Sequence, residues 1–412
     1  KQKTAYEIPK RDWSSDVCSS DLRSMRSLDP RGVDGSRGVS QTRQYTTFVS
    51  QTVDSSDLIT YAIVGTGMMG REHIENIAHI PGLNVAVVVD PNLESQILAT
   101  SLCSKGTPAY KEYESAVSNV PCDAVVIAAP NYTHEMLALE AIESGKHVLI
   151  EKPLTTTVEG CFNVERRAAN SPHQVVGVGL EYRFMAPTKW LLDKVHSGHL
   201  GDVRLVTIIE HRFPFLDKVG SWNRFNENTG GTFVEKCCHF FDLMYQIFKT
   251  EPTAVMAMSA RTVNHRDESY EGRVPDILDN GYVLVEFGDG KCGMLELCMF
   301  AEGSRDEQQI SVVGDSGKAE VRIPSNECSI GARSDGRMGI KTEVLKSDAP
   351  YQGLHHGASY YEHLEFRRAI RGENHFLATL RDGTRSVAIG VAAQRSIEER
   401  RRVTLEEVGY VV

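Results

Sequence analysis

Residues 59–70 read ITYAIVGTGMMG, an apolar strand that runs into a glycine-rich turn and then into a helical pattern. The turn has the spacing G-x-G-x-x-G in the place where a dinucleotide-binding turn occurs. Gly65 permits a tight turn, Gly67 lets the backbone approach a phosphate, and Gly70 lets the helix lie close to the strand. The helix start would then bind a pyrophosphate. The alternative is a strand-to-helix turn without a ligand. The cofactor residues expected here are Gly65, Gly67, Met68, Met69 and Gly70.

The next predicted strand, residues 84–89, ends at Asp90, twenty residues after Gly70. An acidic residue at this spacing typically accepts the hydroxyl groups of the cofactor ribose. Its carboxylate would repel a 2′-phosphate, and the following Pro91 and Asn92 supply no cation for one. The pattern therefore favours NAD over NADP. The alternative is that Asp90 only caps the next helix.

The composition is that of a globular protein, with 412 residues, 41% hydrophobic and 24% charged residues, and a net charge of −10. No apolar run approaches the roughly 18 residues of a membrane helix. Lys and Arg form no block of the kind that binds nucleic acid or an anionic membrane. We therefore expect a small-molecule partner, with no nucleic acid and no membrane.

Nine cysteines without paired C-x-x-C spacing predict reduced thiols and a cytoplasmic location. Cys237 and Cys238 are adjacent beside His239, and neighbouring cysteines cannot easily ligate one ion from a helix. We therefore expect no metal site.

Residues 1–58 are rich in Ser, Arg and Asp and have no sustained period, which predicts a disordered leader. Within this leader, residues 11–22 read RDWSSDVCSSDL and resemble a translated sequencing adapter, so we expect an artefact there. A transit peptide is the alternative for residues 23–43, although Asp29 and Asp34 are unusual in one.

From residue 59 to residue 180, strand and helix patterns alternate, which predicts an α/β domain with a doubly wound parallel sheet. Pro130 and Asn131 follow the apolar strand at residues 124–129, where such a sheet presents its ligand. We assign both residues to the cofactor site, and helix capping by Asn131 is an equal alternative.

The strand at residues 147–150 ends at Glu151 and Lys152, and Pro153 fixes the extended exit of the chain. A charged pair that leaves a buried strand costs free energy unless it has a partner or a task. Its place beside the expected nicotinamide favours function, with Glu151 at the cofactor. An ordinary structural pair is the alternative.

Residues 181–412 have a different character. Segments 203–211, 280–287 and 308–313 alternate apolar and polar residues, as an antiparallel sheet with one open face does. The sequence Gly-Asp-Gly at 288–290 predicts a hairpin between two strands. We expect an α+β domain with a large, mostly antiparallel, open-faced sheet, and a homodimer or homotetramer formed through that face.

A helical pattern over residues 229–248 places Glu235, His239 and Asp242 on one stripe. A carboxylate one turn from a histidine can orient the ring and raise its basicity, as transfer of an alcohol proton requires. The alternative is chance spacing along an exposed helix.

These motifs, with AAPN at 128–131 and GKHV at 145–148, resemble the Gfo/Idh/MocA oxidoreductases, the glucose-fructose oxidoreductase and inositol dehydrogenase family. The resemblance covers residue 59 to the C-terminus. It implies a Rossmann domain, a nicotinamide cofactor and a sugar or cyclitol substrate. It maps the active-site lysine onto Lys152 and the histidine onto His239, and it includes His134 in the cofactor motif.

Two positions depart from the family pattern: Glu235 replaces an aspartate, and Lys236 replaces a small residue. The departures weaken an inositol-type specificity. For Trp222 and Arg183, packing and ion pairing are equal alternatives to substrate contact. The substrate-binding residues that the resemblance implies are Tyr182, Arg183, Trp222 and Asn223. Asp242, on the stripe with His239, is expected to bind a substrate hydroxyl or to stabilise the helix.

The working hypothesis is hydride transfer between nicotinamide and a secondary alcohol or ketone of a sugar, polyol or inositol. His239, steadied by Glu235, would remove the hydroxyl proton, and Lys152 would stabilise the charge on the oxygen. One alternative is an NAD-dependent glycosidase that uses transient oxidation and elimination. The other is a non-catalytic NAD-sensing module.

Overall fold

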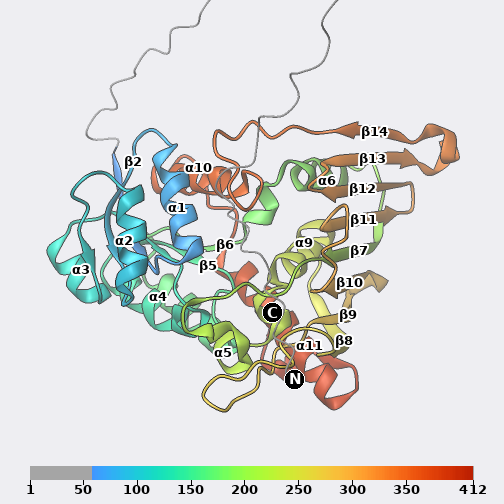
Figure 1. The fold of residues 1–412 in the computed structure, drawn as a ribbon. Helices are drawn as coiled ribbons and strands as arrows, with labels where there is room; N and C mark the ends of the chain where they lie inside the picture. Colours follow the sequence, from blue (N-terminus) through green and yellow to red (C-terminus); the bar gives the residue numbers. More distant parts are fainter. Residues whose placement is uncertain (1–57, 412) are drawn as a thin grey trace, which may run out of the picture. The chain divides into compact units, whose positions relative to one another are not determined.

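A computed structural model describes residues 58–411 of the chain (Figure 1). The predicted leader, residues 1–58, lies outside the described residues apart from Leu58. The predictions of disorder, of an adapter artefact and of a transit peptide therefore stay predictions.

The first part of the chain is a six-stranded parallel sheet with strand order β3-β2-β1-β4-β5-β6. Helix α1 packs against α2, and α4 packs against α5. The order reverses between β1 and β4, which is where a doubly wound sheet binds its ligand. The predicted Rossmann sheet is confirmed. Its elements are β1 Ile59–Val64, α1 Met68–Ala78, β2 Leu83–Val89, α2 Leu93–Leu102, β3 Ala109–Tyr110, α3 Tyr113–Asn119, β4 Ala124–Ile127, α4 His134–Glu143, β5 His147–Glu151, α5 Val158–Ala169 and β6 Val176–Gly179.

The glycine-rich turn between β1 and α1 has two crowded positions and one open position. A Cβ atom on Gly65, where φ is +85°, would lie 2.4 Å from the backbone nitrogen of Ala129. A Cβ atom on Gly70 would lie 2.0 Å from the carbonyl oxygen of Gly65, whereas one on Gly67 would meet no atom within 4 Å. Gly65 and Gly70 are therefore required for packing, and the space at Gly67 is free for a ligand.

The second part of the chain is built on a nine-stranded sheet with strand order β14-β13-β12-β11-β7-β10-β9-β8-β15. Neighbouring strands are antiparallel except β10 and β7, and β9 and β10 are joined at Gly288–Gly290 as the hairpin signal predicted. The predicted mostly antiparallel sheet is confirmed. Its strands are β7 Val203–His211, β8 Pro252–Ala260, β9 Asn280–Phe287, β10 Cys292–Cys298, β11 Gln308–Gly314, β12 Gly317–Ile323, β13 Glu327–Ala332, β14 Lys341–Val344 and β15 Val403–Thr404.

Helices cover one face of this sheet: α9 packs against β7, α6 against β12 and α11 against β8. In Figure 1, α6 and α9 lie on the side of the sheet toward the first domain. The helical elements of this part are η3 Glu181–Phe184, α6 Ala186–His196, η4 Val219–Arg224, α7 Asn226–Thr229, α8 Thr232–Glu235, α9 Cys238–Phe248, η6 Arg333–Gly339, α10 Ala358–Ile370 and α11 Leu380–Glu399.

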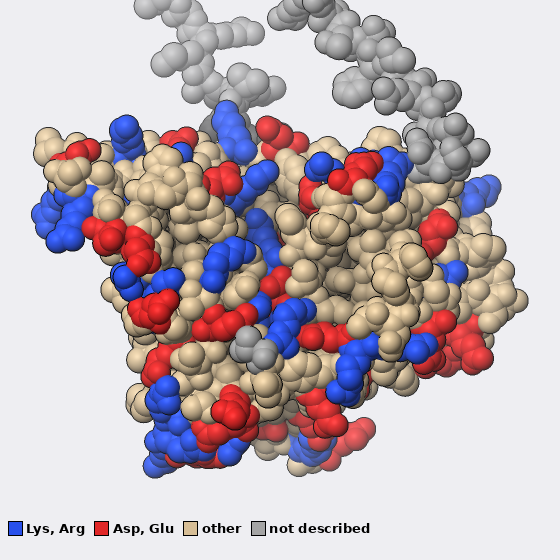
Figure 2. Space-filling view, turned by 180° about the vertical axis from the view of Figure 1, so that it is seen from behind, with Lys and Arg blue, Asp and Glu red and all other residues tan. Residues whose placement is uncertain are grey.

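The uncovered face of the nine-stranded sheet presents large apolar side chains to solvent. Strand β9 alternates, with Val283 and Val285 buried and Tyr282 and Leu284 exposed. Met258 on β8 is 72% exposed. On the surface seen in Figure 2, Lys and Arg are interspersed with Asp and Glu. Within residues 58–411, no helix is both long and apolar enough to cross a bilayer.

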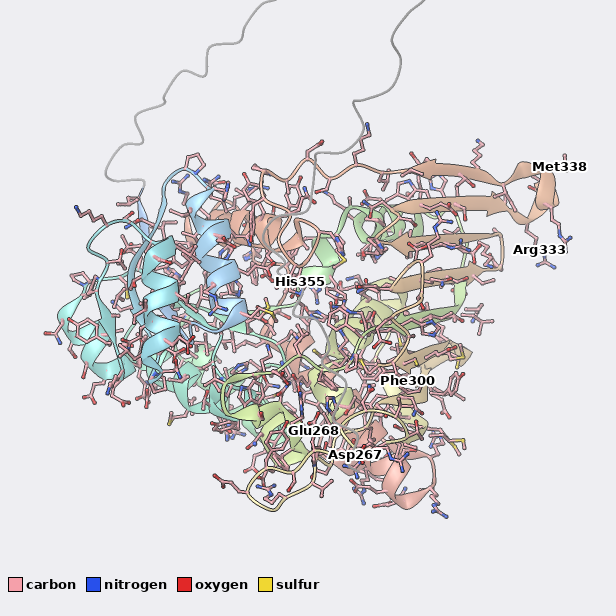
Figure 3. The ribbon with its side chains drawn as sticks, viewed as in Figure 1. Asp267, Glu268, Phe300, Arg333, Met338 and His355 are labelled. Atoms are coloured by element: carbon pink, nitrogen blue, oxygen red, sulfur yellow. The ribbon has the colours of Figure 1, made fainter. Side chains whose placement is uncertain are left out.

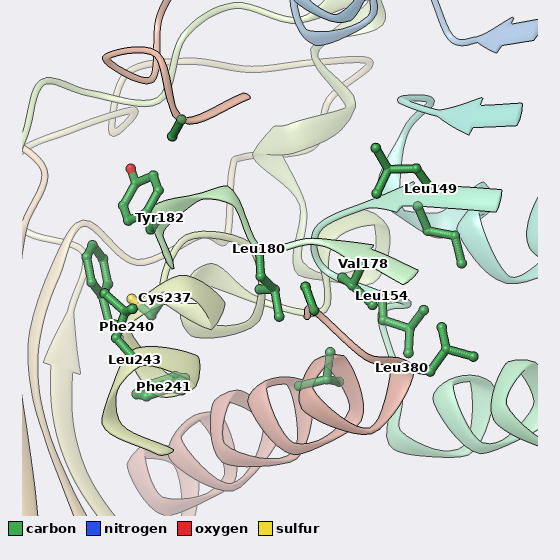
Figure 4. Packing of buried hydrophobic residues seen from close by; sticks show 14 of the residues in the cluster. Leu149, Leu154, Val178, Leu180, Tyr182, Cys237, Phe240, Phe241, Leu243 and Leu380 are labelled. Carbon is green, nitrogen blue, oxygen red and sulfur yellow. The ribbon is translucent and has the colours of Figure 1, made fainter. Parts of the chain in front are cut away.

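The end of the chain packs on both parts of the molecule. The backbone nitrogen of Val178 in β6 donates to the carbonyl oxygen of Ala378 at 3.1 Å, and α11 contacts α5 and β6 as well as α9 and β8. One hydrophobic core runs through this junction, from Leu154 to Leu380 and on to Phe240 (Figure 4). The two parts therefore share buried apolar surface.

The prediction of one helix over residues 229–248 is wrong. Helix α8 ends at Glu235 and α9 begins at Cys238, so the chain breaks at the two residues between them. Both residues keep right-handed angles, with φ −87° and ψ −37° at Lys236 and φ −100° and ψ −2° at Cys237, so the interruption is a local distortion. At this point the Lys236 ammonium pairs with the carboxylate of Glu210 on β7 at 2.9 Å.

Candidate active site

The cofactor end of the site is the start of α1. This helix begins after Gly67 without a side-chain cap, so the N–H groups of its first turn are available to an anion. Met68 and Met69 are only partly buried there. These backbone groups and the open space at Gly67 fit the pyrophosphate of a dinucleotide.

Asp90 ends β2 beside the glycine-rich turn. Its Oδ2 atom accepts hydrogen bonds from the backbone nitrogen of Thr66 at 2.7 Å and from the Thr66 hydroxyl at 3.1 Å. Its Oδ1 atom accepts one from the backbone nitrogen of Asn92 at 2.8 Å, which leaves Oδ1 a second lone pair. The carboxylate is thus held in place and can still accept a ribose hydroxyl. Asn92, and not Asp90, caps α2.

The loop after β4 brings Pro130 and Asn131 to the same edge of the sheet. Asn131 is buried, and its Nδ2 atom has no hydrogen-bond partner among the residues that the structure describes. A buried amide without a partner costs free energy, so this donor fits a ligand acceptor.

His134 does not contact an open space. Its Nδ1 atom lies 2.8 Å from the carbonyl oxygen of Pro153, its Nε2 atom lies 3.0 Å from that of Ala129, and the side chain is fully buried. Both ring nitrogens therefore bind the two loops that flank the cofactor edge, and a cofactor contact by His134 stays a prediction.

Glu151, at the end of β5, faces α1. Its Oε1 atom lies 2.9 Å from Nε2 of His73, whose Nδ1 atom lies 2.9 Å from Nε2 of His363. Burial raises the pKa of Glu151. The hydrogen bond from His73 and the charge of His73 have a larger effect in the opposite direction and lower the pKa to about 2. Glu151 is therefore an ionised neighbour of Lys152, and its cofactor contact stays a prediction.

Lys152 reaches from the first domain to the second. Its Nζ atom donates to the backbone oxygen of Glu235 at 3.3 Å. Burial lowers the pKa of Lys152, but Cys238, Glu151, Glu181 and Glu235 act in the opposite direction and raise it overall. The ammonium group therefore stays protonated and can donate to a substrate oxygen.

The carboxylate next to His239 is Glu181, not Glu235. The Nε2 atom of His239 lies 3.5 Å from Oε1 of Glu181, and the ring stacks on Tyr182 with centroids 3.9 Å apart. Oε2 of Glu235 has no hydrogen-bond partner among the described residues. Orientation of His239 by Glu235 therefore stays a prediction.

His239 is only 3% exposed and is surrounded by cations. Burial, followed by the charges of Lys152, His355, Lys236 and Arg212, lowers its pKa well below the ordinary value. The imidazole is therefore neutral near pH 7 and can accept a proton.

Several predicted substrate residues are buried in structural contacts. Nε of Arg183 donates to Oδ2 of Asp242 at 2.6 Å, and its Nη2 atom lies 2.9 Å from Oδ2 of Asp382. Asn223 is 1% exposed and donates to the carbonyl oxygen of Leu216 at 3.0 Å. In this structure the polar groups of Arg183, Asp242 and Asn223 are bound by the protein itself, and their substrate contacts stay predictions.

Tyr182 and Trp222 have different surroundings. Tyr182 is 3% exposed and supports the ring of His239. Trp222 is partly buried and meets Tyr132 of the first domain edge-on, with centroids 6.4 Å apart. Their substrate contacts stay predictions.

Four functional candidates were not predicted: His73, Glu181, Lys218 and His355. Glu181 follows the end of β6 almost directly, just as Lys152 follows the end of β5. The argument that identified Lys152 from its place after a strand could therefore have identified Glu181. Lys218 lies on the loop before η4. Burial lowers its pKa, and the charges of Lys152 and Arg71 lower it further. Glu235 and Glu151 oppose this shift. His73 and His355 have no local sequence signal.

Comparison with known families gives the class of the protein. Residues 59–180 match the model described as "Oxidoreductase family, NAD-binding Rossmann fold", and residues 193–405 match the model described as "Oxidoreductase family, C-terminal alpha/beta domain". These matches define a two-domain, NAD-binding oxidoreductase. The chain belongs to the Gfo/Idh/MocA oxidoreductase family.

Individual relatives are distant. The chain is 28% identical over 265 residues to the rhizopine catabolism protein MocA of Rhizobium meliloti, covering 63% of this chain and 77% of that protein. It is 25% identical over 351 residues to the myo-inositol 2-dehydrogenase of Thermotoga maritima, covering 84% and 98%. The solved structure of levoglucosan dehydrogenase in complex with NADH and levoglucosan has a TM-score of 0.75 at 20% identity, covering 84% and 99%. That likeness shows the fold.

A substitution separates the structural role of Asp242 from a substrate contact. We expect Asp242→Asn to lower the free energy of unfolding by about 3 kcal/mol, because it removes a buried partner of Arg183. Urea denaturation measures this. The control Asp193→Asn, at an exposed position, should change it by less than about 0.5 kcal/mol. A normal urea midpoint for Asp242→Asn would contradict the structural role.

Proposed function

We propose that this oxidoreductase transfers a hydride between NAD and a secondary alcohol or ketone of a sugar, polyol or inositol. The supporting observation is that the buried Lys152 ammonium reaches the backbone oxygen of Glu235, four residues before His239, and is among the charges that lower the pKa of the buried His239 ring. A proton acceptor and a positive hydrogen-bond donor are the two groups that oxidation of an alcohol requires.

In the direction of oxidation, His239 takes the hydroxyl proton of the substrate. Lys152 donates a hydrogen bond to the same oxygen and stabilises the negative charge that develops on it. Bound NAD supplies the hydride acceptor. The backbone of the α1 start, Asp90 and Asn131 hold the cofactor, and Tyr182 keeps the His239 ring in its plane.

The proposed substrate class rests on the family and on the printed names of its members, which include inositol and levoglucosan dehydrogenases. The ion pair between Lys236 and Glu210 is relevant, because it neutralises the extra cation. A neutral polyol or sugar therefore stays compatible with the site. We also propose a boundary near residue 180 between the cofactor and substrate domains, and a cytoplasmic location.

We propose that NAD is preferred over NADP. Asp90 lies at the end of β2 with Oδ1 still able to accept a hydroxyl, and a 2′-phosphate there would meet its negative charge. We expect kcat/KM to be at least about tenfold higher with NAD, a difference of about 1.4 kcal/mol. Asp90→Ala should reduce this ratio. An equal ratio in the two proteins would contradict the role of Asp90.

We propose a homodimer or homotetramer that buries the open face of the nine-stranded sheet. Its exposed apolar side chains are Leu205, Met256, Met258, Tyr282 and Leu284. Contiguous apolar surface of this kind is typical of an interface. Light scattering should give a multiple of the monomer mass, and Met258→Asp should lower it. A monomeric wild-type protein would exclude the proposal.

The catalytic assignment is tested by two substitutions. We expect Lys152→Met and His239→Asn each to lower kcat by about 100-fold or more, since each removes one group that acts on the substrate oxygen. A panel of polyols, aldoses and inositols is assayed by NADH absorbance, and direct titration checks that NAD still binds.

Near-normal turnover in both variants would exclude the assignment. NADH released in proportion to product identifies a dehydrogenase, whereas product without free NADH would favour the glycosidase mechanism. Tight NAD binding without turnover of any substrate would favour an NAD-sensing module.

A further inference from the structure

A chain of acidic groups and histidines leads from His239 toward the surface. Nε2 of His239 lies 3.5 Å from Oε1 of Glu181, and the same oxygen lies 3.4 Å from Nε2 of His355. Nδ1 of His355 lies 3.1 Å from Oε1 of Glu72 on α1. Glu181 thus bridges two imidazoles.

We propose that Glu181 and His355 form a proton relay that carries the proton taken by His239 to solvent. This inference rests on the proposed function, in which His239 accepts the hydroxyl proton of the substrate. It adds two residues to the reaction that have no counterpart among the residues predicted from the sequence.

A relay is needed because His239 is almost completely buried. Only 3% of its surface is exposed, so the imidazolium formed during oxidation has little direct access to water. Its surroundings of Lys152, Lys236 and Arg212 also make a lasting positive charge unfavourable. The proton must therefore leave the ring through a neighbouring group before the next turnover.

Glu181 has the properties of such a neighbour. It is 1% exposed, and neither carboxylate oxygen has a hydrogen-bond partner among the described residues. Burial raises its pKa to about 7, with Glu151 adding to the rise and with His355 and Lys152 opposing it. A carboxylate of this pKa can accept and release a proton near neutral pH.

His355 provides the exit. It lies in the connection between β14 and α10, between the two domains (Figure 3), and 16% of its side chain is exposed. Glu72 fixes this connection, because its Oε1 atom also accepts hydrogen bonds from the backbone of Leu354 and from the hydroxyl of Ser359. Burial lowers the pKa of His355, but Glu181, Glu72 and Glu151 raise it overall.

The proton balance is simple. The alcohol proton moves to His239, and the imidazolium passes a proton to the Glu181 carboxylate. Neutral Glu181 no longer stabilises the charge on His355, which releases a proton to water and is then reprotonated by Glu181. One proton leaves for each hydride transferred, and Glu181 returns to its ionised form.

The second histidine chain in this region has no such exit. It runs from Glu151 through His73 to His363, which is fully buried. His363 has its pKa lowered well below the ordinary value, first by burial and then by His73. This chain therefore holds Glu151 in place, and the proposed route is the one through His355.

The first test needs no substrate. Nuclear magnetic resonance of ¹⁵N-histidine-labelled, unliganded protein follows the titration of His239 and His355, assigned with His239→Asn and His355→Ala. We expect Glu181→Gln to shift both titration curves to lower pH, because it removes a negative charge beside both rings. Unchanged curves would overturn the proposal. The control is Glu362→Gln, a buried carboxyl whose pKa is raised well above its ordinary value and which is therefore already neutral. It should leave both curves in place.

The second test uses turnover. We expect His355→Ala to lower kcat about tenfold and added imidazole to restore it, because a small base can replace the missing carrier. The wild-type kcat should fall as the pH drops below about 7, when Glu181 becomes protonated and can no longer accept a proton. Glu181→Gln cannot accept a proton at any pH, so it should lower kcat across the whole range and remove this decline.

Normal turnover in His355→Ala, or a loss that imidazole does not restore, would overturn the relay. Failure of the proposed function gives a different result. No alcohol would then be oxidised by the wild-type protein, while the coupled titration of the two histidines would still be measured.

Discussion

The buried ammonium of Lys152 is the constraint on which the rest of the site depends. A charge removed from water is costly unless opposite charge and hydrogen-bond acceptors surround it. Here the acceptor is the backbone oxygen of Glu235 in one domain, and the neighbouring carboxylate of Glu151 comes from the other. Burial lowers the pKa of His239, and the charge of the same ammonium lowers it further. One buried region therefore contains a protonated donor and an unprotonated acceptor.

Other buried charges around the site neutralise one another. Arg183 is paired with Asp242 and Asp382, and Lys236 is paired with Glu210. Removing a single member would leave an uncompensated ion in the interior. These pairs therefore fix η3, α9 and β7 relative to each other. Among the described residues, Glu181, Glu235 and His239 each keep a buried polar side-chain atom without a hydrogen-bond partner.

Local sequence patterns predicted what local physics determines. The glycine spacing, the apolar strands of the parallel sheet and the alternation in β9 follow from backbone sterics and burial, and all are present. Local patterns cannot predict partners that are distant in sequence. Arg183 and Asp242 are 59 positions apart, and the partner of Lys236 is on β7. The expected single helix is interrupted at Lys236 and Cys237, where this ion pair to β7 forms. His355 approaches Glu181 only through the folded connection before α10.

Helix α11 limits how far the two domains can move apart. It packs on α5 and β6 of the cofactor domain and on α9 and β8 of the other. A wide opening between the domains would expose the buried apolar surface of this shared helix to water. The free-energy cost is roughly 25 cal/mol for each Å² exposed. The contacts of α11 therefore hold the element that ends at Lys152 and the helix that carries His239 within one packed unit.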